Sequence, residues 1–342
     1  MLRIARPTTS EGTSSGWGDV FAALRGALEA GELEIPLPGG GDTARRWAAL
    51  CRYGRADLAL GRLVEGHTDA VAILHESGAK PEPGALYGVW ASRASGKGAV
   101  LTDRPDSGPV LTGTIPFCSG AGQLDRALVV ARPDGSAGAA DDVVIKIALP
   151  DARIRPLPDT WHAAGMADSR SWDVELHEVP VREEDRVGPP GFYTGRPGFR
   201  LGAMGVAAVW LGGTAGVVDR VAEHLAARAP DEHQLAHLAA MHVAVEAVDS
   251  TLATAAEAVD TSGTGTDRAI TAGTCRSAAE RAACEVLARA PRVTGPGPLS
   301  RDAAFTRRLA DLEVYVRQHH AERELADLGR SLLLARAGER AT

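Results

Sequence analysis

The sequence is poor in cysteine, with four residues among 342, and none of them forms a CxxC pair or has a metal-site spacing. We therefore predict that Cys51, Cys118, Cys275 and Cys284 are free thiols, and we predict no metal site. Free thiols are typical of a reducing compartment, so a cytoplasmic location is expected.

Long runs of lysine and arginine are also lacking, and the formal net charge is −7. Binding to a nucleic-acid backbone requires clustered positive charge, so no nucleic-acid partner is predicted. The first 15 residues contain two arginines but no apolar run behind them, which argues against a secretory signal. The longest apolar stretch, residues 202–218, is rich in glycine and runs into Asp219 and Arg220. A buried helix explains it better than a membrane span, so no membrane association is expected.

Three consecutive segments differ in pattern, and we predict three regions: helices over 1–80, a β domain over 81–195 and a helical bundle over 196–342. Apolar residues recur at helical spacing over 17–33 and again over 42–78. Asp42 is a candidate cap for the second stretch, and Gly78 suits its end.

The middle segment contains short runs of β-branched residues bounded by glycine, proline and aspartate. These runs predict strands at 108–117, 126–132, 142–150 and 172–181. In the last run the apolar positions are Val174 and Leu176, then Val179 and Val181 after a shift of one, and a β-bulge would explain the shift.

Four long alanine- and leucine-rich helices are expected after residue 200, the last of them over 300–336. Asp231 is a candidate cap for the second, with Gln234 at its third helical position. Such a series predicts an antiparallel four-helix bundle, so the expected fold class is α+β. Neither a βαβ alternation nor a GxGxxG motif after a strand is found, which argues against a doubly wound nucleotide-binding fold.

Several segments, in the same order along the chain, resemble the acyl-CoA dehydrogenase family. The first two are RADLALGRLVEGHTDAVAILHESG and LTGTIPFCSGAGQLDRALVVAR, which resemble the family's late N-terminal helices and its central strand pair. WHAAGMADSRSWDVELHEVPV is similar to its "GMRATGSxDVxxxxVxVP" strand, and TGPGPLSRDAAF to its "GGxGY…RDA" run. The resemblance covers roughly residues 50 to 340. It implies an N-terminal helical region shorter than usual, a middle β domain, a C-terminal bundle and bound FAD.

The segment Phe117-Cys118-Ser119 is the main candidate for contact with the flavin ring. Alternation along a strand would place Phe117 and Ser119 on one face, and the resemblance implies an aromatic wall and a hydroxyl on flavin N5 there. A strand end with a Ser-Gly turn is the simpler alternative. Val89 and Trp90 lie where the family's backbone receives the flavin pyrimidine edge, although Trp90-Ala91-Ser92 replaces the family's Thr-Glu-Pro.

Three further residues are candidates for contact with the FAD diphosphate. Arg228 and Gln234 lie near the arginine and glutamine with which the family reaches across a subunit interface. Arginine suits that task through its fixed fork of donors, but Arg228 could equally be a solvated cation at a helix end. Gly295 could admit the diphosphate or simply form a turn. The resemblance implies a homodimer or homotetramer.

The catalytic glutamate of acyl-CoA dehydrogenases has no counterpart at its usual place after Arg301-Asp302-Ala303, nor near Gly202. Counting from the two flanking motifs leads to Asp311 or to His319 and His320 as substitutes. Adjacent histidines on a helix point about 100° apart, so at most one of them can face a site, and such histidines are usually surface residues. A histidine there could act as an acid or base near neutral pH.

Three functions are compatible with these residues. The first is an FAD-dependent oxidoreductase of the acyl-CoA dehydrogenase type, acting on a CoA thioester or a related small molecule. The second is a monooxygenase of the same fold that uses reduced flavin and O2, which Phe117-Cys118-Ser119-Gly120 and Gly165-Met166 fit somewhat better. The third is a non-catalytic subunit that forms a hetero-oligomer with a paralogue.

Overall fold

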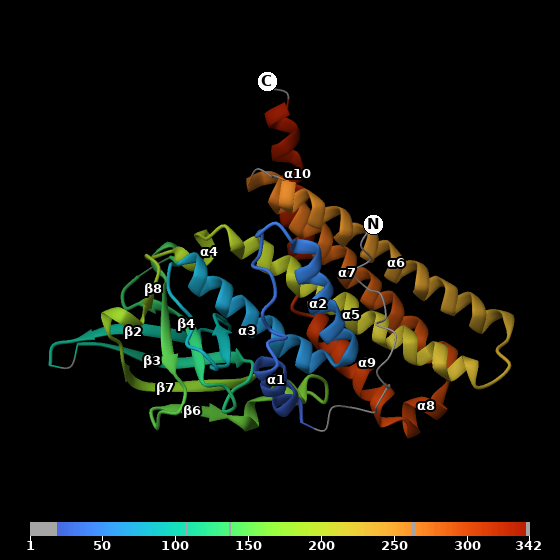
Figure 1. Cartoon of the computed structure of the whole chain (residues 1–342), viewed down its shortest axis with the longest axis horizontal. Helices are drawn as coiled ribbons and strands as arrows, with labels where there is room; N and C mark the ends of the chain where they lie inside the picture. Colours follow the sequence, from blue (N-terminus) through green and yellow to red (C-terminus); the bar gives the residue numbers. More distant parts are fainter. Residues whose placement is uncertain (1–18, 107, 137, 262–264, 340–342) are drawn as a thin grey trace.

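The computed structural model describes residues 19–106, 108–136, 138–261 and 265–339, and Figure 1 shows a β domain beside a group of long helices. Three helices come first: α1 (Val20–Glu29), α2 (Thr43–Ala56) and α3 (Leu58–Glu76). The strands follow as β1 (Tyr87–Trp90), β2 (Gly98–Arg104), β3 (Gly108–Cys118), β4 (Arg126–Pro133), β5 (Val143–Ala148), β6 (Ile154–Leu157), β7 (Trp172–Pro180) and β8 (Arg186–Val187). The later helices are α4 (Phe192–Gly195), α5 (Gly198–Ala226), α6 (Glu232–Thr261), α7 (Gly265–Thr294), α8 (Pro296–Arg301), α9 (Ala303–Val316) and α10 (Glu322–Glu339).

The strands form one mixed sheet in the order β6-β7-β3-β2-β4-β5-β8, and β1 adds to β4 in parallel. The four predicted strands are confirmed as β3, β4, β5 and β7. The predicted bulge is confirmed in β7, where the pairing with β3 shifts register and Glu178 takes a left-handed φ of 50°. An extra residue in one strand produces such a shift and re-aims the side chains beyond it.

Helix α5 forms the centre of the helical region and packs on α2, α7, α3, α6 and α9. Its contact with α2 depends on glycine, because a Cβ at Gly212 would lie 2.1 Å from the backbone oxygen of Cys51. Within the described residues α5 is long and apolar enough to span a membrane, but 83% of its most apolar window is buried inside the protein. The predicted buried helix at 202–218 is therefore confirmed.

The ends of two helices differ from their predicted form. The stretch expected to be helical over 42–78 breaks at Asp57, which is extended and accepts the Leu60 N–H at the start of α3. At the start of α2, it is the Asp260 side chain that accepts from both Thr43 N and Thr43 Oγ1. The expected cap by Asp42 is therefore wrong, because a residue on α6 supplies these bonds.

Two other predicted helix ends are confirmed. Asp231 and Gln234 form a reciprocal capping box at the start of α6, in which each side chain bonds the other's backbone N–H. Gly78 takes a φ of 80° directly after α3, as a residue ending a helix often does.

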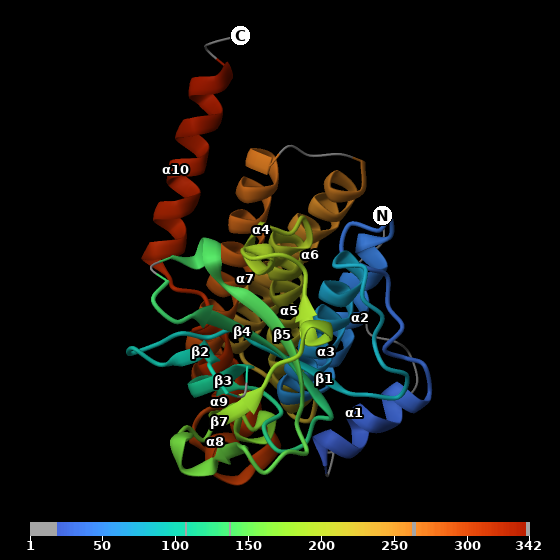
Figure 2. The same ribbon diagram turned by 90° about the vertical axis from the view of Figure 1, so that its left-hand side faces the viewer.

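The fourth long helix expected over 300–336 is wrong, since the chain forms α8, α9 and α10 there. Asp302 is extended and caps α9 by accepting the Phe305 N–H. Between α9 and α10, Ala321 takes a left-handed φ of 41° and donates its N–H to His319 Nδ1. The last helix, α10, extends beyond the other helices and exposes Leu332, Leu333 and Leu334 (Figure 2).

Helix α3 joins the two halves of the molecule. Ala70, Ile73 and Leu74 pack against the sheet together with Tyr87 and Leu128. Toward the other side, α3 contacts α5 and α9. The junction of α3, β1 and the end of β3 is therefore where sheet and helices meet.

Candidate functional site

A narrow cavity lies at this junction. Its lining comes from α3, from β1 and from the segment after β3, namely Arg62, Leu63, Gly66, Tyr87, Gly88, Val89, Ser119 and Leu124. Two of the predicted flavin contacts, Val89 and Ser119, thus lie on one cavity. Among the described strands β1 pairs with β4 alone, and its second edge can offer backbone donors and acceptors to a ligand.

Phe117 and Ser119 differ from the predicted strand alternation. Phe117 is 56% exposed and contacts Trp161 edge-on, whereas Ser119 is 7% exposed. The cause is a left-handed φ of 59° at Phe117, where the pairing of β3 with β7 is irregular between Ile115 and Cys118. A reversed φ turns the next side chain, so alternation by two no longer holds.

Trp90 and Cys118 are buried in the sheet core and support the segment behind Ser119. The Trp90 indole N–H donates to the Ser119 carbonyl at 3.1 Å. Burial raises the pKa of the Cys118 thiol well above its usual value, and its Sγ contacts the Ile115 carbonyl. As cofactor ligands both residues stay predictions, and their observed contacts hold the strand end in place.

Three serine hydroxyls form a buried chain that ends at the cavity. Ser119 Oγ lies 2.8 Å from Ser171 Oγ, which lies 2.8 Å from Ser169 Oγ. Ser169 Oγ then donates to the Met166 carbonyl at 2.7 Å. We call Ser119, Ser169 and Ser171 the serine chain. The pairing of β3 with β7 brings Cys118 opposite Trp172 and so creates it.

An ion pair that the sequence did not reveal lies beside the cavity. Arg62, which lines it, bonds the Glu65 carboxylate one turn along α3. Burial raises the pKa of Glu65, against the lowering effect of Arg62. A charged pair at this spacing on a helix usually lies in solvent. The pair of Arg62 and Glu65 is buried because α3 packs on the sheet and on the helices α5 and α9.

Two buried side chains have unused hydrogen-bonding capacity, and one of them, Tyr315, lies near this pair. Among the described residues, neither Tyr315 Oη nor Trp210 Nε1 finds a hydrogen-bond partner. Burial and the charge of Glu65 raise the pKa of Tyr315. Buried polar atoms are rarely left unpaired, so these two atoms are suited to a ligand or water.

Asp311, a predicted catalytic residue, is buried and engaged in structural contacts. Its Oδ1 accepts the Met166 N–H at 2.5 Å, and Arg307 lies 3.4 Å from its Oδ2. Arg307 also pairs with Asp57 and Asp168, which ties α9 to α3 and to the loop before β7. Burial raises the pKa of Asp311 to about 6, although the Met166 N–H and Arg307 act in the opposite direction.

His319 and His320 lie in the connection between α9 and α10, so their expected place within one helix is wrong. His319 is buried with its ring edge-on to Trp210, and His320 is exposed. The Nδ1 of His319 accepts the Ala321 N–H, which leaves the proton on Nε2, 3.2 Å from Ser277 Oγ. Burial lowers the pKa of His319, so the ring is neutral near pH 7.

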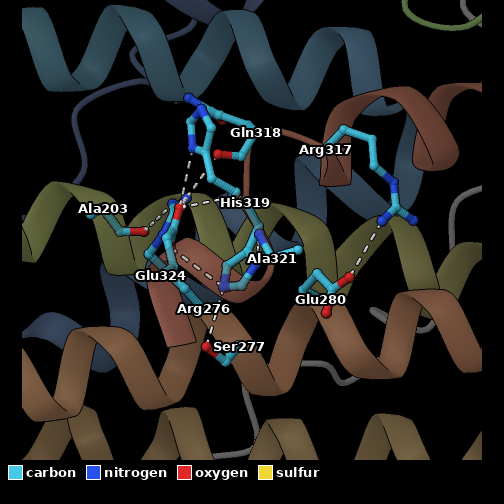
Figure 3. A network of polar contacts seen from close by, with 10 residues as sticks. Ala203, Arg276, Ser277, Glu280, Arg317, Gln318, His319, Ala321 and Glu324 are labelled. Atoms are coloured by element: carbon cyan, nitrogen blue, oxygen red, sulfur yellow. Dashed lines mark hydrogen bonds and ion pairs between the residues drawn. The ribbon is translucent and has the colours of Figure 1, made fainter. Parts of the chain in front are cut away.

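Arg276 occupies the centre of the contacts drawn in Figure 3. Its guanidinium forms two bonds with Glu324, at 2.9 and 3.0 Å, and stacks 4.7 Å from the centre of the Trp210 ring. Burial opposes the charge of Glu324, but the bonds and charge of Arg276 outweigh it and lower the pKa of Glu324 to about 2. We call Arg276, Ser277, His319 and Glu324 the Arg276 network.

The residues predicted to hold the FAD diphosphate lie far along the chain from the cavity lining. Arg228 is exposed at the end of α5 and lies 3.3 Å from His224 Nδ1. Gln234 uses its oxygen in the capping box and donates its amide to the Val293 carbonyl at 3.0 Å. Gly295 begins α8 with a φ of 67°. Their role toward a second copy of the chain stays a prediction.

Comparison with known proteins identifies relatives of this arrangement. Residues 190–317 match the family "Acyl-CoA dehydrogenase, C-terminal domain". A dibenzothiophene monooxygenase of Rhodococcus qingshengii is 29% identical over 155 residues, which cover 40% of this chain and 36% of that protein. The alignment therefore spans little more than a third of the curated relative.

Solved structures share the fold over nearly the whole chain. The dibenzothiophene monooxygenase TdsC of Paenibacillus sp. A11-2, in complex with FMN and indole, has a TM-score of 0.76 at 19% identity and covers 92% of this chain and 95% of its own. KijD3, in complex with FMN and a dTDP-sugar, has a TM-score of 0.77 at 18% identity, with 92% and 86% covered. The methanesulfinate monooxygenase MsuC of Pseudomonas fluorescens has a TM-score of 0.78 at 17% identity, with 92% and 90% covered. The predicted α+β fold is confirmed.

Proposed function

We propose that the chain is a flavin-dependent monooxygenase of the acyl-CoA dehydrogenase superfamily that acts on a small organic substrate. Reduced flavin would supply the two electrons with which one oxygen atom of O2 enters the substrate and the other leaves as water. The expected acyl-CoA dehydrogenation becomes the second candidate.

The observation that carries the proposal is that Ser119 lines the cavity between α3 and β1. A flavin needs a polar contact at N5 and backbone groups at its pyrimidine edge, and Ser119 with the second edge of β1 supplies both kinds. Ser119 is held by Trp90 from behind. In this proposal Ser119 and Val89 would hold the flavin.

FMN is the flavin to test first. The relatives TdsC and KijD3 were solved with FMN. In this chain the side chain of Gln234 already uses its oxygen and its amide within the protein, which argues against a contact from that side chain to an FAD diphosphate. The cofactor prediction thereby changes from FAD to a flavin, in which the AMP half of FAD is not required.

The proposal assigns the substrate to the side of the cavity that Arg62 lines, with the unpaired Tyr315 and Trp210 as further candidate contacts. Tyr315 Oη and Trp210 Nε1 each have a hydrogen to donate, and Arg62 adds positive charge. A substrate with an oxygen or other hydrogen-bond acceptor would satisfy these donors.

Dehydrogenation is supported by one observation, the buried Glu65 with its raised pKa beside the cavity. A base of that kind is what removal of a proton next to a thioester requires. The substitutes predicted from sequence are less suitable, because Asp311 holds Met166 and His320 is exposed in the connection between α9 and α10.

The test combines flavin binding with turnover. Purified protein is titrated with reduced FMN under anaerobic conditions, and Ser119→Ala is expected to weaken binding by about three- to tenfold, the equivalent of one hydrogen bond. Ser300→Ala is the matched control, since Ser300 is exposed and bonds only carbonyls of its own helix.

Turnover then separates the candidates. Oxygen consumption and product formation that need a separate flavin reductase support the monooxygenase. Prompt anaerobic bleaching of bound flavin by saturated acyl-CoA thioesters contradicts it and favours the dehydrogenase. Protein that binds no flavin until a paralogous subunit is added favours the partner-subunit function.

A further inference from the structure

The serine chain has a fixed direction, which can be read from its far end. Each serine hydroxyl has one hydrogen to donate, whereas a carbonyl oxygen can only accept. The hydroxyl of Ser169 therefore donates its one hydrogen to the Met166 carbonyl. Ser171 must then donate to Ser169, and Ser119 must donate to Ser171. The Ser119 oxygen is left with lone pairs only.

The acceptor at the end of the chain is held firmly. Met166 has a left-handed φ of 58°, and its N–H is bound by the buried Asp311 carboxylate. A Cβ at the neighbouring Gly165 would lie 2.1 Å from the Ala310 carbonyl oxygen, so the loop lies directly on α9. These contacts fix the position of the Met166 carbonyl.

The cavity end is held equally well. The Gly120 N–H donates to the Ser169 carbonyl at 2.8 Å, and Trp90 donates to the Ser119 carbonyl. Reversal of the chain would turn the 2.7 Å bond between Ser169 Oγ and the Met166 carbonyl into a contact between two lone pairs. Reversal therefore loses at least one hydrogen bond.

We infer that Ser169 and Ser171 are positioning residues that present Ser119 to the flavin as an acceptor only, so that the site prefers reduced flavin. This inference rests on the proposed function. In oxidised flavin N5 has a lone pair and no hydrogen, whereas in reduced flavin N5 carries a hydrogen that it can donate. An acceptor at N5 bonds the reduced form and meets the oxidised form lone pair to lone pair.

The direction of the chain thus suits an enzyme that collects reduced flavin from solution. Such an enzyme would bind reduced flavin more tightly than the oxidised flavin that remains after the reaction. The preference is expected to be about tenfold in affinity, the equivalent of one hydrogen bond.

The experiment measures the dissociation constants of oxidised FMN in air and of reduced FMN under anaerobic conditions. The unmodified protein is expected to bind reduced FMN about tenfold more tightly, which raises the two-electron midpoint potential of bound flavin by about 30 mV. In Ser171→Ala the Ser119 hydrogen is free to turn toward N5, so the ratio of the two constants is expected to fall to near one. Ser171→Thr keeps a hydroxyl and is expected to retain the preference.

Controls separate a failure of this inference from a failure of the proposed function. Ser300→Ala is expected to keep the ratio of the unmodified protein, and thermal unfolding shows whether Ser171→Ala is folded. If both forms of FMN bind but Ser171→Ala keeps the unmodified ratio, the serine chain does not set the preference. If the folded, unmodified protein binds neither form, the proposed function fails and the inference fails with it.

Discussion

The serine chain is a buried set of polar side chains and the Arg276 network a largely buried one, but they differ in what they leave unbonded. In the network, Arg276 and Glu324 match each other's charge, and the ring nitrogens of His319 have partners in Ala321, Ser277 and Glu324. In the serine chain, the last residue, Ser119, lines a cavity, and its hydroxyl oxygen can accept a further hydrogen bond. Buried polarity alone therefore does not mark a site, because it can equally fasten helices together.

The largest effect is expected from breaking the Arg276 network. Arg276→Met removes the main partner of the Glu324 carboxylate and the stacking on Trp210. Loss of one member of a fully buried pair costs about 3–5 kcal/mol, so about 2–3 kcal/mol is expected for this partly exposed pair. Urea unfolding measures the loss. Arg330→Met is the matched control, since Arg330 pairs with Asp327 at the exposed surface of α10 and should change stability by less than about 1 kcal/mol. Equal losses of unfolding free energy in the two variants would show that the Arg276 network does not stabilise the packing of the helices.

The second effect concerns Asp311, which supports the far end of the serine chain. Its pKa is raised from 3.8 to about 6, so the folded protein holds this proton more tightly than the unfolded chain does. Stability is therefore expected to fall as the pH rises from about 4 to about 6, by at most about 3 kcal/mol. Glu324, with its pKa lowered to about 2, acts in the other direction and loses its stabilising effect as the pH falls below about 4.5.

Asp311→Asn isolates the first of these two contributions. The amide oxygen can still accept the Met166 N–H, but the residue no longer titrates. Unfolding followed across pH 4 to 7 should lose the decline that the unmodified protein shows. Asp327→Asn, at an exposed ion pair, should leave the decline in place. A decline that persists in Asp311→Asn would mean that another group causes it.

The comparison also shows which features could be predicted from sequence. The four main strands, the bulge in β7 and the capping box of Asp231 with Gln234 follow from local patterns, and the structure confirms them. The serine chain could not be predicted, because it joins Ser119 to residues about 50 positions away through the register of β3 and β7. The register of β3 against β7, with its two irregular positions, is what places Ser171 beside Ser119.

The errors share a cause, since each depends on a contact from elsewhere in the chain. Asp260 on α6 replaces the expected cap of α2, and a left-handed φ at Phe117 turns Ser119 away from it. The long helix expected over 300–336 stops where Ala321 donates its N–H to His319. Arg62 with Glu65 was overlooked because a charged pair on one helix turn usually lies in solvent, and only packing on both sides of α3 buries it.

The smallest effect is expected at His320, which was predicted together with His319 as a catalytic candidate. Its side chain is exposed and lies 3.7 Å from Glu324, whereas its hydrogen bond to Glu324 comes from the backbone N–H, which alanine retains. His320→Ala should therefore change the free energy of unfolding by no more than about 0.5 kcal/mol and leave FMN affinity and turnover unchanged. His319→Ala is the informative neighbour, because it removes a buried ring from Trp210, Ser277 and Ala321 and should cost about 2 kcal/mol. A loss of turnover in His320→Ala at full stability would place this exposed ring in the reaction after all, and it would move the functional site toward the connection between α9 and α10.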